Sequence, residues 1–134
     1  MLALFVDDDA HLRSLFQMQC SPIKNLRTIS ARNGAEALEI IATQTPDIIF
    51  SDLNMPLMDG FALWEKVRAE KKTQTTPFIL ITSDITAHGN STKNSAQIQQ
   101  IRTDPNARLL RKDNLQQKVL VEIIEAARPK FIPL

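Results

Sequence analysis

A chain of 134 residues, 43% of them apolar, has the size of one ordinary domain and enough apolar material for a core. Sixteen Lys and Arg nearly balance fifteen Asp and Glu, which excludes the strong basic field that draws proteins onto nucleic acid. The single cysteine excludes an internal disulfide framework, gives no support to a zinc site, and favours a cytoplasmic setting.

Short apolar runs alternate along the chain with segments of helical period. The opening MLALFV leads straight into three aspartates, so it predicts a strand at 2–6 and is neither a signal peptide nor a membrane span. A helix is expected over 11–20, ended by Pro22. The remaining elements are expected, in order, as a strand at 25–31, a helix at 33–43, a strand at 46–52, a helix at 61–71, a strand at 77–82, a strand at 107–111 and a helix at 115–127.

This alternation predicts an α/β fold, a doubly wound five-stranded parallel sheet with helices on both faces. Each crossover between parallel strands must be long enough to contain a helix, and the apolar runs IIF and FILI are typical of strands covered on both sides. We expect one domain over residues 1–128, followed by a short tail at 129–134.

Polar side chains follow the carboxyl ends of four of these strands, where open parallel sheets bind their ligands. They are Asp7, Asp8 and Asp9 after the first strand, Asp52 after the third, Thr82 and Ser83 after the fourth, and Arg111 and Lys112 after the fifth. Clustered carboxylates repel one another unless a cation joins them, and oxygen ligands favour Mg²⁺. A carboxylate beside Mg²⁺ can attack a phosphoryl group, whose charge a lysine and a threonine hydroxyl can stabilise. The pattern therefore predicts a phosphoryl-accepting site.

The motifs FVDDD, SDLNMPLMDG, ILITS and LLRKD make the chain resemble the receiver domain of bacterial two-component response regulators, over about residues 2–127. The resemblance implies a flavodoxin-like sheet with strand order 2-1-3-4-5. It also implies roles for five residues: the acidic pair at Asp7 and Asp8, the phosphoacceptor at Asp52, a metal-binding backbone carbonyl at Asn54, and the hydroxyl at Thr82.

The same resemblance implies a signalling domain that is not an enzyme in the usual sense. Asp52 would accept a phosphoryl group from phosphohistidine on a sensor histidine kinase or a histidine phosphotransfer protein, with Mg²⁺ as cofactor. Asn54 stands where phosphatases of the haloacid-dehalogenase type need a second aspartate, so hydrolysis is expected to be slow. Only RPKFIPL follows the last helix, so we expect a stand-alone regulator that signals to an unknown protein, with the first helix docking the kinase.

Two registers are possible for the cation in LLRKD. Counting forward from the two leucines selects Lys112, whereas counting back from Leu115 selects Arg111. We choose Lys112, because a compact amine can bridge a phosphoryl oxygen and Asp52, whereas a planar guanidinium needs more room.

Three features depart from the family pattern and keep a second function open. The segment between Thr82 and Lys112 is longer than typical receivers allow, Arg108 or Leu109 replaces the usual aromatic of the fifth strand, and Asp113 replaces a proline that normally follows the lysine through a cis bond. Within the long segment, 91–101 could form a fourth helix, and 84–95 is expected to be mobile. The alternative is a receiver-like scaffold that binds a partner without phosphorylation.

Structural roles are expected for several other residues. Asp9 is expected to cap the first helix, and Asp59 with Gly60 to start the third. Trp64 is expected to pack in the core, and Cys20 to be inert.

Overall fold

The computed structural model describes residues 1–83 and 92–128, and the side chains of 92–95 are not described. The predicted mobile segment at 84–95 and the predicted tail at 129–134 therefore lie mostly or wholly outside the described residues.

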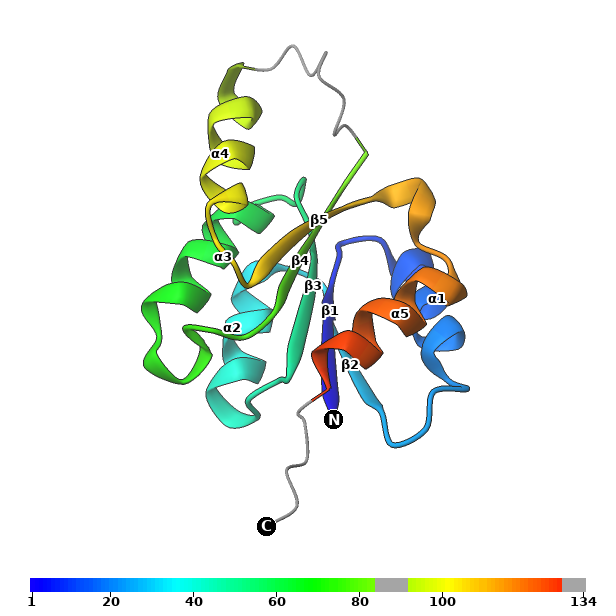
Figure 1. The fold of residues 1–134 in the computed structure, drawn as a ribbon. Helices are drawn as coiled ribbons and strands as arrows, with labels where there is room; N and C mark the ends of the chain where they lie inside the picture. Colours follow the sequence, from blue (N-terminus) through cyan, green and yellow to red (C-terminus); the bar gives the residue numbers. More distant parts are fainter. Residues whose placement is uncertain (84–91, 129–134) are drawn as a thin grey trace.

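Strands and helices alternate along the described chain (Figure 1). The strands are β1 (Leu2–Val6), β2 (Arg27–Ala31), β3 (Ile48–Asp52), β4 (Phe78–Thr82) and β5 (Ala107–Arg111). The helices are α1 (Ala10–Cys20), α2 (Gly34–Thr43), α3 (Gly60–Ala69), α4 (Thr92–Arg102) and α5 (Gln117–Ala127), with short 3₁₀ turns η1 (Lys71–Thr73) and η2 (Lys112–Asn114).

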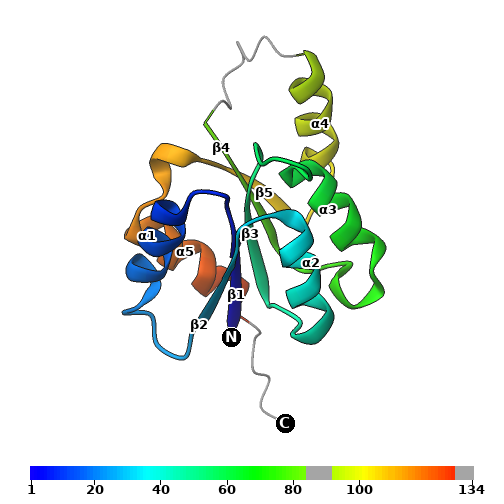
Figure 2. The same cartoon turned by 180° about the vertical axis from the view of Figure 1, so that it is seen from behind.

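The five strands form one parallel sheet in the order β2-β1-β3-β4-β5, so the predicted fold class is confirmed. Helices α1 and α5 cover one face of the sheet, and α2, α3 and α4 cover the other (Figures 1 and 2). Every residue of β1, β3 and β4 is buried, as expected for central strands with helices on both sides.

Successive residues of β1 enter two different cores, because side chains alternate across a strand. Leu4 and Val6 pack with the α2 and α3 side, while Ala3 and Phe5 pack with the α1 and α5 side. On that second side the ring of Phe16 from α1 stacks on Phe5, with 4.4 Å between ring centroids. This contact fixes α1 against the sheet beside the end of β1.

Side-chain caps set the start of three helices. Asp9 accepts a hydrogen bond from the His11 N–H at the start of α1, and Asp59 accepts one from the Ala62 N–H at the start of α3. Asp9 was predicted to cap the first helix, and Asp59 with Gly60 to start the third, and both predictions are confirmed. Asn33 plays the same part for α2.

Some predicted ends were wrong. The third helix was expected to reach residue 71, but it ends at Ala69, where the Val67 carbonyl accepts both the Glu70 N–H at 3.3 Å and the Thr73 hydroxyl at 2.7 Å. The second strand begins at Arg27, because Asn25 has φ 60, which no extended strand allows. The uncertain fourth helix does form at Thr92–Arg102, and among its described side chains only Ile101 is buried.

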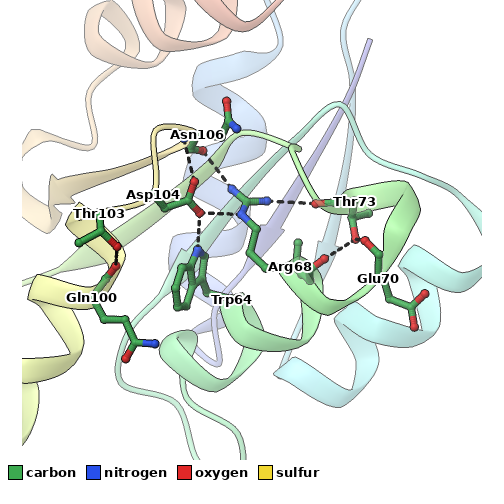
Figure 3. Close-up of polar contacts among 9 residues, drawn as sticks. Trp64, Arg68, Glu70, Thr73, Gln100, Thr103, Asp104 and Asn106 are labelled. Atoms are coloured by element: carbon green, nitrogen blue, oxygen red, sulfur yellow. Dashed lines mark hydrogen bonds and ion pairs between the residues drawn. The ribbon is translucent and has the colours of Figure 1, made fainter.

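A polar cluster ties α3 to the turn before β5 (Figure 3). One oxygen of Asp104, Oδ2, accepts the Trp64 indole N–H at 2.8 Å and Arg68 Nε at 2.6 Å. The other oxygen accepts the Asn106 backbone N–H at 2.8 Å, and Arg68 also donates to the carbonyls of Thr73 at 3.0 Å and Asn106 at 3.2 Å. Burial works against ionisation of Asp104, but these hydrogen bonds outweigh it and lower its pKa. Trp64 is buried in the core as predicted, and it has this second, polar role as well.

Candidate functional site

The carboxyl ends of β1 and β3 bring three aspartates together, as their positions in the sequence predicted. Carboxylate oxygens of Asp7, Asp8 and Asp52 all lie within 4.8 Å of one another. Asp7 and Asp52 are buried, whereas Asp8 is exposed. The cluster is therefore reached from solvent through Asp8.

Burial makes the charged forms of the two inner carboxylates costly. It raises the pKa of Asp7 to about 6, the backbone N–H of Asp9 opposes this shift, and the nearby charge of Asp52 adds to it. Burial also raises the pKa of Asp52, and the charge of Lys112 opposes that shift. The two carboxylates thus gain from any cation placed between them.

One oxygen of the cluster shows that a divalent cation fits. Oδ1 of Asp7 accepts the Asp9 N–H at 2.9 Å, but the buried Oδ2 has no hydrogen-bond partner among the described residues. A buried carboxylate oxygen without a partner is unfavourable, and three carboxylates are the hard oxygen donors that Mg²⁺ accepts. The donor set of Asp7, Asp8 and Asp52 therefore suits Mg²⁺.

Lys112, and not Arg111, reaches the cluster. Lys112 Nζ lies 3.6 Å from Oδ2 of Asp52, although the lysine belongs to η2 and not to β5. Arg111 ends β5 with its guanidinium 3.1 Å from the exposed Asp113. No peptide bond among the described residues is cis, and the turn Lys112–Asn114 occupies the place where a changed loop was expected.

The other predicted site residues lie at the same edge of the sheet. Thr82 is buried at the end of β4, where β4 runs beside the end of β3. Asn54 is exposed, and its backbone N–H donates to the Asp52 carboxylate and favours the ionised form. The catalytic and metal-binding roles of Thr82, Lys112 and Asn54 stay predictions.

The loop between Asp52 and α3 contains a contact that the sequence analysis missed. A Cβ built on Gly60 would lie 2.4 Å from the Asp52 carbonyl oxygen and 2.7 Å from Cδ1 of Leu80. The Gly60 N–H also donates to the Leu53 carbonyl at 2.9 Å. Gly60 starts α3 as predicted, and in addition the absence of its side chain lets the helix start directly against the backbone of Asp52. The sequence pair Asp59-Gly60 predicted the turn, but it did not predict this close contact with the Asp52 carbonyl.

A model of the response regulator receiver domain matches residues 3–103. The chain belongs to this family. Receiver domains act in two-component phosphorelay signalling, interact with histidine kinases or phosphotransfer proteins, and generally bind Mg²⁺ at an acidic pocket.

Curated relatives resemble the chain over part of their length. The transcriptional regulator NtrC of Escherichia coli is 37% identical over 78 residues, which is 58% of this chain and 16% of NtrC. A CheY homologue of Campylobacter jejuni is 34% identical over 86 residues, which is 63% of this chain and 65% of that protein. The matched part is thus a small fraction of NtrC and about two thirds of the CheY homologue.

Solved structures show the same fold at low identity. CheY4 of Vibrio cholerae superposes with a TM-score of 0.77 at 23% identity, covering 95% of this receiver domain and 98% of CheY4. The receiver domain of a Syntrophus aciditrophicus histidine kinase gives a TM-score of 0.78 at 23% identity, with 99% and 97% covered. Within residues 1–83 and 92–128, no helix of this receiver is both long and apolar enough to cross a membrane.

Proposed function

We propose that Asp52 accepts a phosphoryl group from phosphohistidine on a histidine kinase or phosphotransfer protein, and that the reaction requires Mg²⁺. The observation that carries the proposal is that two acidic groups and a lysine ammonium surround the Asp52 carboxylate. This buried carboxylate lies beside the carboxylates of Asp7 and Asp8, and one of its oxygens is 3.6 Å from the Lys112 ammonium. Such a carboxylate can approach a phosphoryl group only where cations neutralise the charges of both.

Mg²⁺ would be held by Asp7, Asp8, Asp52 and the backbone carbonyl of Asn54, and it would supply positive charge to the phosphoryl oxygens. A carboxylate oxygen of Asp52 attacks phosphorus, an O–P bond forms, and the P–N bond to the donor histidine breaks with its electron pair going to the imidazole nitrogen. Burial raises the pKa of Asp52, and the charge of Lys112 opposes this shift and so favours the ionised form that attacks.

After transfer, two groups of this chain stabilise the product. The Lys112 ammonium neutralises phosphoryl charge, and the Thr82 hydroxyl donates a hydrogen bond to a phosphoryl oxygen. We propose that the acyl phosphate then shifts the face formed by α4 and β5 between two conformations, and that a protein partner binds one of them. Because residue 54 is Asn and not a second acidic group, loss of the phosphoryl group to water is slow.

The test is incubation with Mg²⁺ and acetyl phosphate, followed by intact-protein mass spectrometry. The natural protein should gain one phosphoryl group and the Asp52→Asn protein none. Asp9→Asn is the matched control, because it also replaces a carboxylate of the same edge of the sheet by an amide. Asn caps a helix as well as Asp does, so this protein should fold and still gain the phosphoryl group. A mass gain in the Asp52→Asn protein would show that another residue is the acceptor.

The metal is tested separately by titration calorimetry with MgCl₂. Asp8→Ala should weaken Mg²⁺ binding by at least about tenfold, because it removes a charged oxygen ligand. No mass gain in the natural protein, with Mg²⁺ binding unaffected by Asp8→Ala, would favour the scaffold function over phosphorylation.

A further inference from the structure

The loop that contains Asp7 and Asp8 is held by an arginine from α1. Arg13 Nη1 donates a hydrogen bond to the backbone carbonyl of Asp7 at 2.8 Å, and the Arg13 backbone N–H donates to the Asp9 carbonyl at 3.1 Å. On its other side, the Asp7 N–H donates to the Ala31 carbonyl at the end of β2, at 3.1 Å. The backbone polar groups of Asp7 are thus both paired, one with β2 and one with α1.

The contact places the cationic side chain of Arg13 on a neutral backbone carbonyl of the loop that contains Asp7, Asp8 and Asp9. In the part of the chain that the structure describes, Arg13 forms no ion pair with any carboxylate. The Oδ2 of Asp7 has no hydrogen-bond partner in the same part of the chain. Arg13 therefore fixes the backbone of the acidic loop and leaves the carboxylates free for another cation.

A restraint on the Asp7 carbonyl directly affects the position of Asp8. The peptide group between residues 7 and 8 is planar, so the direction of the Asp7 carbonyl fixes the position of the Asp8 Cα. Asp8 is exposed and lacks the packing that holds Asp7. The orientation of the exposed carboxylate therefore depends on its backbone, and Arg13 is the side chain that restrains this peptide group.

We propose that Arg13 is a positioning residue that holds the Asp7–Asp8 peptide in the conformation that binds the divalent cation. The proposal rests on the Mg²⁺ site proposed above. Charge and position act in opposite directions here, which makes the proposal testable. If Arg13 acted only through its charge, removing it would strengthen Mg²⁺ binding, because a competing cation would be gone. If Arg13 acts by position, removing it weakens Mg²⁺ binding.

The experiment is titration of MgCl₂ into the natural protein and into Arg13→Gln, Arg13→Lys and Arg27→Gln. Arg27→Gln is the matched control, because it removes the same charge at the opposite end of β2. Among the described residues, the Arg27 guanidinium donates to Gln44 at 3.2 Å. Arg13→Gln should raise the Kd for Mg²⁺ about tenfold, as loss of groups that orient metal ligands does elsewhere. Arg13→Lys should raise it less, because an amine can donate one hydrogen bond to the carbonyl. Arg27→Gln should leave it unchanged.

Urea unfolding of the same proteins separates positioning from a purely structural role. A structural role alone would lower the free energy of unfolding and leave the Kd of the folded protein unchanged. A cleft of about 60 Å³ between α1 and β2 is lined by Arg13 and by Phe16, Gln17, Thr28, Ile29 and Ser30, so water can replace the lost guanidinium and the fold should tolerate the change. If Arg13→Gln still fails to fold, the Arg13→Lys titration decides, with a Kd about threefold above the natural one expected.

Two results would overturn the inference in different ways. An unchanged or lower Kd in the folded Arg13 variants, with normal Mg²⁺ binding in the natural protein, refutes the positioning role and leaves the proposed function intact. Absence of Mg²⁺ binding in the natural protein refutes both.

Discussion

Replacing Asp104 with asparagine should destabilise the fold strongly, because its two oxygens serve three donors. Oδ2 accepts from Trp64 at 2.8 Å and from Arg68 at 2.6 Å, and Oδ1 accepts the Asn106 N–H at 2.8 Å. Asparagine has one oxygen and one NH₂ group. Whichever way the amide is turned, the NH₂ group faces at least one N–H that had an acceptor before.

The expected loss follows from these contacts. A buried donor left without an acceptor costs roughly 1–3 kcal/mol. The Arg68 side chain is 14% exposed and that of Asp104 10%, so the guanidinium also loses its counter-ion in a poorly solvated place. Together we expect Asp104→Asn to reduce the free energy of unfolding by about 3 kcal/mol, a large part of the roughly 5–15 kcal/mol typical of a domain.

Urea unfolding measures this loss. Trp64 is the only tryptophan, so its emission reports the same region, and far-ultraviolet circular dichroism checks that the whole domain unfolds with it. Asp113→Asn is the matched control, because its ion pair with Arg111 is exposed, at 65% for the Asp113 side chain, and should cost less than about 0.5 kcal/mol. A loss below about 1 kcal/mol for Asp104→Asn would refute the reasoning.

The pH dependence has a definite sign. The folded-state pKa of Asp104 is lowered, so its contribution to stability is complete above the unfolded value near 4 and is lost as pH falls through the folded value. The difference between the natural protein and Asp104→Asn should therefore be constant from about pH 6 to 8 and shrink below about pH 4. A difference that grows on acidification would contradict the assignment.

Other predictions concern the site and the one thiol. Lys112→Ala should abolish the change in amide hydrogen exchange that phosphorylation produces in α4 and β5, and Arg111→Ala should preserve it; the reverse result would mean that the cation was assigned to the wrong residue. Gly60→Ala should cost about 1–3 kcal/mol of stability and slow phosphorylation, because its Cβ would press on the Asp52 carbonyl; a stability gain in urea unfolding would contradict the contact. Burial raises the pKa of Cys20 to about 12, so iodoacetamide at pH 8 should alkylate it at least about 100-fold more slowly than in the urea-unfolded chain, and equal rates by mass spectrometry would contradict its burial.

Local patterns predicted the fold because the chain obeys them nearly everywhere. Alternating apolar runs and helical periods gave the parallel sheet, and the strand ends gave the meeting of Asp7, Asp8 and Asp52. The choice of Lys112 over Arg111 also agrees with the structure, because a compact amine beyond the strand end reaches Asp52. The order of the strands needed the resemblance to the family, since spacing alone cannot rank strands in a sheet.

Contacts between distant segments could not be predicted in this way. The close approach of Gly60 to the Asp52 carbonyl depends on where α3 lies against β3, which a turn signal does not encode. Arg13 had the pattern of an ordinary helix residue, and its bond to Asp7 depends on how α1 packs. A buried indole N–H needs an acceptor, so the sequence predicts that Trp64 has one. It does not predict which residue accepts, because Asp104 lies 40 residues away in the chain.

The strand order also bears on how the chain folds as it leaves the ribosome. The first three strands in the sequence, β1, β2 and β3, are neighbours in the sheet, so the segment up to Ala69 can pair them and cover both faces with α1, α2 and α3. Strand β4 then adds to the free side of β3, and β5 adds to the far side of β4. Until Phe78–Thr82 has been synthesised, β3 is an unpaired apolar edge, the kind of surface that pairs with other chains and aggregates. A nascent receiver is therefore most exposed to aggregation after its acidic cluster has formed and before the strand that contains Thr82 arrives.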